Sequence, residues 1–202
     1  MTTPKPKRIK LTIVGDGATG KTCLLMVYKE EKFPQEYVAT VFENYVKYLT
    51  YEGKGIELVL WDTAGQEDYD SIRPLSYPDT DVILLCYAID QRESFDNIIN
   101  KWQEELKQYC PKIPIVLVGT KKDLRSEIIT SSDIENSNKV DFVLRDEGRK
   151  MSESISASAF VECSSLTGEA VNDVFESAIK ATLQRRKKFK YRLRKYSCFI
   201  PV

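Results

Sequence analysis

The chain has 202 residues, of which 42% are hydrophobic, and it carries 30 basic and 30 acidic side chains. No run of about 18 apolar residues occurs, so the sequence offers no candidate transmembrane helix. The polar, basic start lacks the apolar core of a signal peptide, and we expect a cytosolic protein. The complete absence of histidine excludes His-based triads and His-ligated metal sites. Five scattered cysteines without a Cys-x-x-Cys pair argue against a zinc site and a disulfide framework.

The zero net charge hides two segments of opposite charge. Eight Lys or Arg and no acid lie within Arg185–Lys195, which leaves residues 1–184 with 22 basic and 30 acidic groups, a net charge of −8. We expect a flexible N-terminus over residues 1–8, one domain over residues 9–184 and a basic C-terminal tail over residues 185–202.

Apolar patterns predict six strands and four helices. Val82–Ile89 is an uninterrupted apolar run, as expected of a strand buried on both faces. Two strands separated by Gly53 and Gly55 are typical of a hairpin. Apolar residues at spacings of three and four from Val171 to Leu183 predict a final amphipathic helix. In chain order the predicted elements are strand Ile9–Val14, helix Gly20–Glu31, strands Val41–Tyr51, Ile56–Trp61 and Val82–Ile89, helix Phe95–Tyr109, strand Pro114–Val118, helix Glu147–Ala157, strand Ala159–Cys163 and the final helix.

This order of elements indicates an α/β domain with a mostly parallel, six-stranded sheet and helices on both faces. Ligands of such sheets bind at the carboxyl ends of the strands. Ser126–Asp141 is polar and weakly periodic, and we interpret it as a surface insert that reaches to about residue 146.

A glycine-rich motif follows the first strand and opens the first helix. It fits Gly-x-x-x-x-Gly-Lys-Ser/Thr, whose backbone N–H groups surround phosphates at a helix N-terminus. Lys21 can reach the terminal phosphates, and the Thr22 hydroxyl can bind magnesium. We expect the motif and the residue after it to bind a nucleotide: Gly15, Asp16, Gly17, Ala18, Thr19, Gly20, Lys21, Thr22 and Cys23.

A second motif, Asp62 to Gln66, follows the strand Ile56–Trp61. An acid at the end of a strand beside a phosphate loop is a magnesium partner, commonly through water. The N–H of Gly65 can contact a terminal phosphate. The Gln66 amide both donates and accepts hydrogen bonds, so it can orient an attacking water.

Two further segments follow later strands and are predicted to hold the base. Thr120, Lys121 and Asp123 follow the strand Pro114–Val118. A carboxylate can accept hydrogen bonds from guanine N1 and the 2-amino group, a donor pair that adenine lacks. Ser164, Ser165 and Leu166 follow the last strand and can offer backbone N–H groups to the guanine carbonyl.

In this order the motifs resemble those of Ras-superfamily GTPases, and the likeness to the Rho family covers roughly residues 9–184. The segments in which the sequence resembles the Rho family are Phe33-Pro34, Thr40-Val41-Phe42-Glu43-Asn44-Tyr45, Leu60 to Tyr69, Arg73-Pro74-Leu75-Ser76-Tyr77, Val116 to Lys121 and Glu147-Gly148. The polar insert lies where Rho proteins carry their signature insert. Cys198, a candidate lipid acceptor, departs from the family pattern because it is fifth from the end, whereas a prenylation box has its Cys fourth from the end.

The resemblance implies a GTP/GDP switch that uses Mg²⁺, hydrolyses GTP slowly and signals to effectors, with the cytoskeleton as the expected target. It implies that Thr40 binds magnesium with Thr22 and Asp62, that Phe33 packs on guanine and that Tyr37 covers the phosphates. The catalytic residues are expected to be Gln66, Lys21 and Thr40. Exchange factors, activating proteins, a dissociation inhibitor and effectors are the implied partners, with effectors bound through Thr40–Tyr45 and Gly65–Tyr77.

Two alternatives differ in class from a switch. A nucleotide-locked scaffold without turnover would not need Gln66 and Thr40, and a kinase that binds an adenine nucleotide is disfavoured by Asp123. No Arg lies between Lys21 and Lys47, so an arginine finger is missing from this segment and unaided hydrolysis should be slow.

The basic segment Arg185–Lys195 has three interpretations. It can be a solvated tail or a nucleic-acid or nuclear-import patch, or it can bind anionic lipid, where each Lys or Arg contributes about 1 kcal/mol. We favour the inner face of the plasma membrane and expect no nucleic-acid partner.

Overall fold

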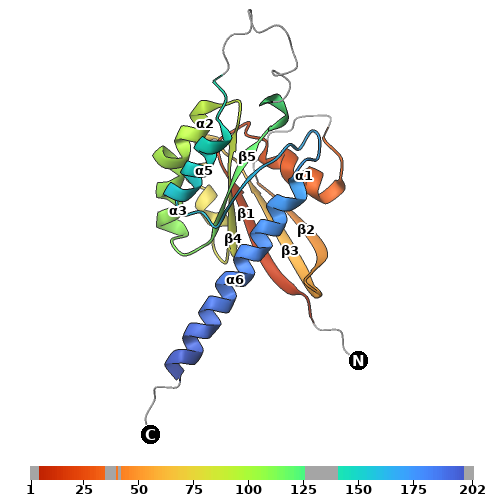
Figure 1. Cartoon of the computed structure of the whole chain (residues 1–202), viewed down its shortest axis with the longest axis vertical. Coiled ribbons are helices and arrows are strands. Elements are labelled where there is room, and N and C mark those ends of the chain that lie inside the picture. Colours follow the sequence, from red (N-terminus) through yellow and green to blue (C-terminus); the bar gives the residue numbers. More distant parts are fainter. Residues whose placement is uncertain (1–4, 35–39, 41, 126–140, 198–202) are drawn as a thin grey trace, which may run out of the picture.

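The computed structural model describes residues 5–34, 40, 42–125 and 141–197. Figure 1 shows a central sheet with helices packed on it and one long helix, α6, that projects beyond the body. The strands are β1 (Lys7–Val14), β2 (Phe42–Tyr51), β3 (Lys54–Thr63), β4 (Val82–Ala88), β5 (Ile115–Thr120) and β6 (Ala159–Glu162). The helices are α1 (Lys21–Glu30), α2 (Arg92–Asn97), α3 (Gln103–Tyr109), α5 (Arg145–Ser154) and α6 (Val171–Ser197), with the short helices η1 (Glu67–Tyr69), η2 (Arg73–Ser76) and η3 (Ile98–Trp102).

The sheet has the order β2-β3-β1-β4-β5-β6, and only its edge strand β2 is antiparallel to its neighbour. The predicted mostly parallel, six-stranded sheet is therefore confirmed. The predicted hairpin is β2–β3, and its turn residues Glu52 and Gly53 both have positive φ, 47° and 71°. Positive φ at both positions matches the right-handed twist of the two strands.

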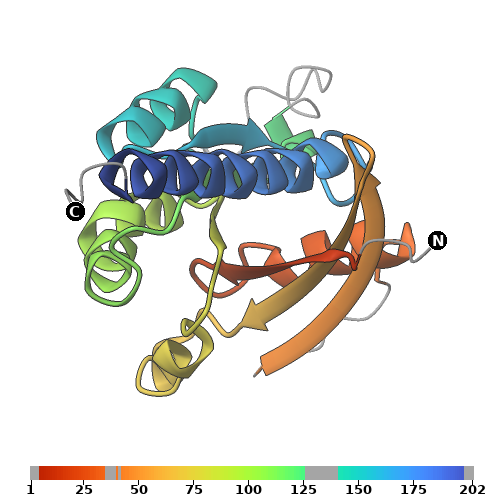
Figure 2. The same cartoon turned by 90° about the horizontal axis from the view of Figure 1, so that it is seen from below.

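Helices cover both faces of the sheet, as expected (Figure 2). Alternate residues of β4 point into two separate cores: Leu84 packs with α1 and α6 on one face, and Leu85 packs with α2, η3 and α3 on the other. All seven positions of β4 are buried, which explains its uninterrupted apolar sequence. In the part of the chain that the structure describes, no helix combines the length and apolar character needed to cross a bilayer.

The helices differ from the sequence prediction at three places. The helix predicted over Glu147–Ala157 spans Arg145–Ser154, so it begins within the predicted insert. The segment predicted as one helix over residues 95–109 begins at Arg92 and contains a π turn, η3, between α2 and α3. The last helix continues past the predicted domain end at residue 184 to Ser197. Residues 184–197 contain no Gly or Pro, so propensity allows the helix to continue.

Candidate nucleotide-binding site

The phosphate-loop motif joins β1 to α1 at the carboxyl edge of the sheet. Gly15 has a φ of 140°, and a Cβ there would lie 2.2 Å from the Cys86 carbonyl oxygen, so a side chain would disrupt the loop. Gly20 is the N-cap of α1 and has a φ of 81°. The loop therefore needs glycine at these two positions, and it leads its backbone directly into the N-terminus of α1.

Lys21, the first residue of α1, folds back over the loop. Its ammonium donates to the carbonyl oxygens of Gly15 and Asp16 at 2.8 and 2.7 Å. The Thr19 hydroxyl also donates to Asp16 O, at 2.8 Å. Burial lowers the pKa of Lys21. The loop thus holds a cation at its centre, where phosphate charge would be bound.

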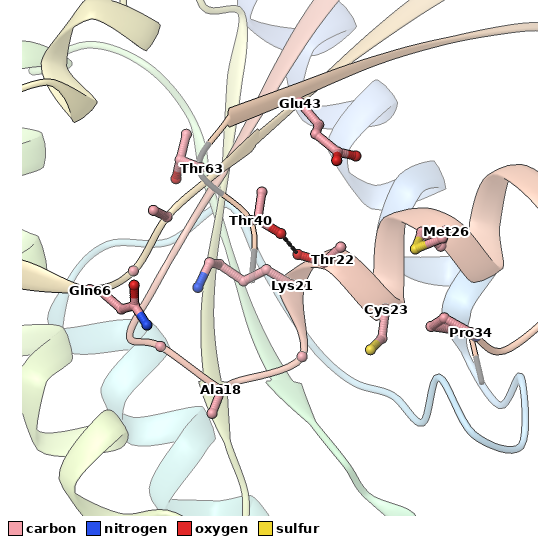
Figure 3. Close-up of a pocket in the computed structure, with 14 residues that line it drawn as sticks. Ala18, Lys21, Thr22, Cys23, Met26, Pro34, Thr40, Glu43, Thr63 and Gln66 are labelled. Atoms are coloured by element: carbon pink, nitrogen blue, oxygen red, sulfur yellow. Dashed lines mark hydrogen bonds between the residues drawn. The ribbon is translucent and has the colours of Figure 1, made fainter. Parts of the chain in front are cut away.

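A cluster of oxygen atoms joins three segments beside the loop. The hydroxyls of Thr22 and Thr40 lie 2.6 Å apart (Figure 3), and Thr40 donates to Asp62 Oδ2 at 3.4 Å. Asp62 is fully buried, and its second oxygen, Oδ1, has no hydrogen-bond partner among the described residues. Burial raises the pKa of Asp62 to about 6, while hydrogen bonding from Thr22 favours the charged form.

These three side chains fit a magnesium ion. Mg²⁺ binds oxygen ligands. In nucleotide sites it is commonly held by one or two protein carboxylates together with water and phosphate oxygens. Two hydroxyls and one buried carboxylate with an unused oxygen provide such a set. The sequence predicted Thr22, Thr40 and Asp62 as metal ligands, and the structure brings all three together from α1, the segment before β2, and β3.

The segment after β3 packs directly against the phosphate loop. A Cβ on Gly65 would lie 2.2 Å from the Gly15 carbonyl oxygen, so only glycine permits this approach. The Gln66 side chain lines the same pocket as Lys21 and Thr40 (Figure 3). This pocket has a volume of about 210 Å³ and is lined by Gly17, Ala18, Gly20, Lys21, Thr22, Cys23, Met26, Pro34, Thr40, Glu43, Thr63, Ala64, Gly65 and Gln66.

The two segments predicted to hold the base lie side by side. The Thr120 hydroxyl donates to the carbonyl oxygen of Thr19 at 2.6 Å and so joins the end of β5 to the phosphate loop. The N–H of Lys122 donates to Cys163 O at 3.0 Å, which places the residues after β5 next to those after β6. Lys121 pairs with Asp90 at 3.2 Å.

The remaining predicted base contacts differ in exposure. Asp123 and Ser165 are half-buried, Ser164 is buried, and Leu166 is 57% exposed. Phe33 is 44% exposed, while Tyr37 lies outside the described residues. The structure thus places the predicted residues that it describes at one edge of the sheet, and their individual roles stay predictions.

A family model described as Ras family matches residues 10–184. The chain belongs to the Ras family. As a Ras-family GTPase it binds GTP or GDP with Mg²⁺, hydrolyses GTP and acts as a small switch. Members of the family generally work with exchange factors, activating proteins and effectors.

Sequence reasoning missed one part of this GTPase site. The Asp16 carboxylate accepts hydrogen bonds from Asn97 and Trp102, and a buried Arg73 donates to backbone on both sides of Gly65. A charged residue inside the motif and an arginine close after it were the available signals. Their partners lie too far along the chain for spacing to identify them.

Proposed function

We propose that this Ras-family GTPase is a Rho-type switch whose unaided hydrolysis is slow and depends on an activating protein. The observation that carries the proposal is the composition of the pocket: Gln66 and Thr40 lie in it beside Lys21, which is the one cation among its described lining residues. Such a site can orient water and stabilise phosphate charge, but it lacks the arginine that strongly accelerates hydrolysis in related enzymes.

Single-turnover hydrolysis of bound GTP tests this proposal. We expect an unaided rate on the order of 10⁻⁴–10⁻³ per second and a large acceleration by the catalytic domain of a Rho-type activating protein. A variant of that domain without its arginine is the matched control and should give little acceleration. Absence of hydrolysis under both conditions would instead support a nucleotide-locked scaffold.

We also propose that effectors bind at two exposed surfaces next to the site. The first lies on β2, where Phe42, Val46 and Tyr48 are 40, 46 and 70% exposed, and the second includes Ile72 and Leu75, which are 45 and 76% exposed. Exposed apolar side chains gathered beside the switch residues favour protein partners. Phe42 falls within Thr40–Tyr45, and Ile72 and Leu75 fall within Gly65–Tyr77, the segments that the Rho likeness implies. The same likeness suggests effectors of the actin cytoskeleton and a dissociation inhibitor.

The end of the body opposite the nucleotide supports a third proposal, contact with an anionic membrane. An open groove there is lined by six cations and, among its described residues, by no carboxylate: Lys7, Lys54, Lys112, Arg185, Arg186 and Lys187. In the described part of the chain only Arg186 of these six makes an ion pair, with Asp81 at 2.8 Å. The basic segment Arg185–Lys195 continues from this groove along α6.

Sedimentation with vesicles tests the membrane proposal. We expect binding to anionic vesicles at low salt and release by salt, because such attraction falls off within a Debye length. Replacing Lys7, Lys54 and Lys112 by Gln should weaken binding more than replacing Arg145, Arg149 and Lys150, which are exposed on α5. Equal weakening by the two triple variants would mean that net charge alone acts. In cells, Cys198→Ser tests for a lipid anchor.

A further inference from the structure

The phosphate loop is bound to a helix on one face of the sheet through the Asp16 side chain. Oδ1 accepts from the indole N–H of Trp102 at 2.7 Å, and Oδ2 accepts from the Asn97 amide at 2.7 Å. Trp102 is fully buried. An indole N–H in an apolar core needs a partner, since an unpaired donor there costs about 1–3 kcal/mol. Both carboxylate oxygens are thus held by one helical segment.

The π turn of η3 makes this double contact possible. Asn97 and Trp102 are five residues apart, and in an α-helix of 3.6 residues per turn such positions lie about 140° apart around the axis. Hydrogen bonding of the i→i+5 type brings positions five apart close to the same side. The π turn spans Ile98–Trp102, so it begins directly after Asn97 and ends at Trp102. Single π turns are frequent at functional sites.

The other side of Trp102 contacts the segment that carries Gln66. The Arg73 guanidinium lies 4.5 Å from the centre of the Trp102 ring, and Arg73 is only 2% exposed. Its Nε donates to Ala64 O at 3.1 Å and its Nη2 to Gln66 O at 3.4 Å. Its buried charge is paired with Glu105 at 2.9 Å and also with Asp70. Arg73 therefore holds the backbone on both sides of Gly65.

We propose that these contacts form a bridge, Asp16–Trp102–Arg73, that positions Gln66 relative to the phosphate loop. Asn97, Trp102 and Arg73 are then positioning residues for hydrolysis and do not touch the nucleotide. A bridge is needed because Gln66 and the loop come from different segments, and a misplacement of about 1 Å at a reacting group can cost about 10²-fold in rate. The inference rests on the proposed role of Gln66.

Charge placed beside Asp16 tests the bridge with little change in volume. Asn97→Asp sets a second carboxylate against Oδ2, so the two groups repel and the contact opens. Asn97 is half-buried, so the fold should tolerate the change. Asn100→Asp makes the same substitution at an exposed position three residues later and is the matched control.

The measurement is single-turnover hydrolysis of bound GTP by the full chain, with GTP dissociation followed in parallel. We expect Asn97→Asp to slow hydrolysis roughly tenfold, because a small misplacement of a reacting group has a rate cost of this order. The rate of GTP dissociation should change less than about twofold, since the bridge is not expected to contact the nucleotide. Asn100→Asp should change neither. Equal rates for the two variants would overturn the bridge. Loss of GTP binding in step with hydrolysis would also overturn it, because Asn97 would then support binding.

A double-mutant cycle tests whether Trp102 acts through the same hydrogen bond. Trp102→Phe keeps the aromatic face for Arg73 and removes the N–H. Combined with Asp16→Ala it should add little further slowing, since both changes remove one interaction. Trp61→Phe is the control, because the buried Trp61 N–H has no hydrogen-bond partner among the residues that the structure describes, and its effect should add to that of Asp16→Ala. Full additivity in the Trp102 cycle would contradict the bridge.

The same measurements distinguish a failure of the bridge from a failure of the proposed role of Gln66 in hydrolysis. If the unsubstituted chain and Gln66→Leu hydrolyse GTP equally, the role of Gln66 fails. If Gln66→Leu is impaired while Asn97→Asp and Trp102→Phe are not, only the bridge fails.

Discussion

Gly17 and Gln66 face each other across the nucleotide site, and a Cβ built on Gly17 would lie 3.5 Å from Gln66 Cγ. One added carbon is therefore tolerated, whereas the branched side chain of valine would displace the Gln66 amide. We predict that Gly17→Val keeps GTP bound but nearly abolishes activator-stimulated hydrolysis. Gly17→Ala, the matched control, should retain a larger share of the rate. Stimulated hydrolysis of Gly17→Val at the unsubstituted rate would contradict this prediction.

Gln66→Leu should slow stimulated hydrolysis on the order of 10²-fold, the loss that follows removal of one positioned transition-state contact. Leucine has a similar size but no amide, so it cannot orient water. GTP affinity should change little, because Gln66 is expected to act on the attacking water. Filter binding and single-turnover hydrolysis separate the two effects, and a parallel loss of affinity would assign Gln66 to binding instead.

Asp123→Asn should weaken GTP binding by about 1–3 kcal/mol, the cost of leaving polar groups unpaired. The same change should improve binding of xanthosine triphosphate, which carries a carbonyl oxygen where guanine carries its 2-amino group. Asp146→Asn, on the exposed side of α5, should affect neither nucleotide. Competition binding with both nucleotides measures the preference, and unchanged GTP affinity in Asp123→Asn would remove Asp123 from the base site.

Thr22→Ala should remove the magnesium dependence of nucleotide release. The Thr22 hydroxyl lies 2.6 Å from that of Thr40, and both belong to the oxygen cluster around Asp62. In the unsubstituted protein, chelation of Mg²⁺ should speed GDP release. Thr22→Ala should release GDP quickly with and without Mg²⁺. A variant that still responds to chelation would show that Thr22 is not a metal ligand.

Phe175→Ala should lower the free energy of unfolding by about 3–5 kcal/mol, the usual cost of emptying a buried aromatic site. Phe175 is fully buried and stacks on Tyr28 with ring centres 3.6 Å apart, which joins α6 to α1. Arg186 lies on the same helix and pairs with Asp81, which directly precedes β4. Arg186→Gln breaks this partly exposed pair and should cost less than about 1 kcal/mol. Urea unfolding of both variants checks the contrast, and similar costs would contradict it.

The parts of the molecule that were predictable from sequence depend on neighbours in the chain. The phosphate loop is eight consecutive residues, and β4 has the apolar sequence of a strand with two buried faces. The contact between Asp16 and Trp102 joins residues 86 positions apart, and no periodicity encodes such a distance. The extension of α6 was also missed, because the basic residues that follow Gln184 in the sequence were interpreted as a tail. Tyr37, most of the segment before β2 and residues 126–140 lie outside the described residues.

Helix α6 has 27 residues, which corresponds to a length of about 40 Å. Its first half packs on the sheet through Val174, Phe175, Ala178 and Ile179, so the basic half is the continuation of an anchored rod (Figure 1). A flexible tether would let the body tumble above a bilayer, whereas a continuous helix sets both its height and its tilt. If the basic segment binds a membrane, the nucleotide edge lies at the far end of the body, and the two proposed effector surfaces remain accessible to partners in solution.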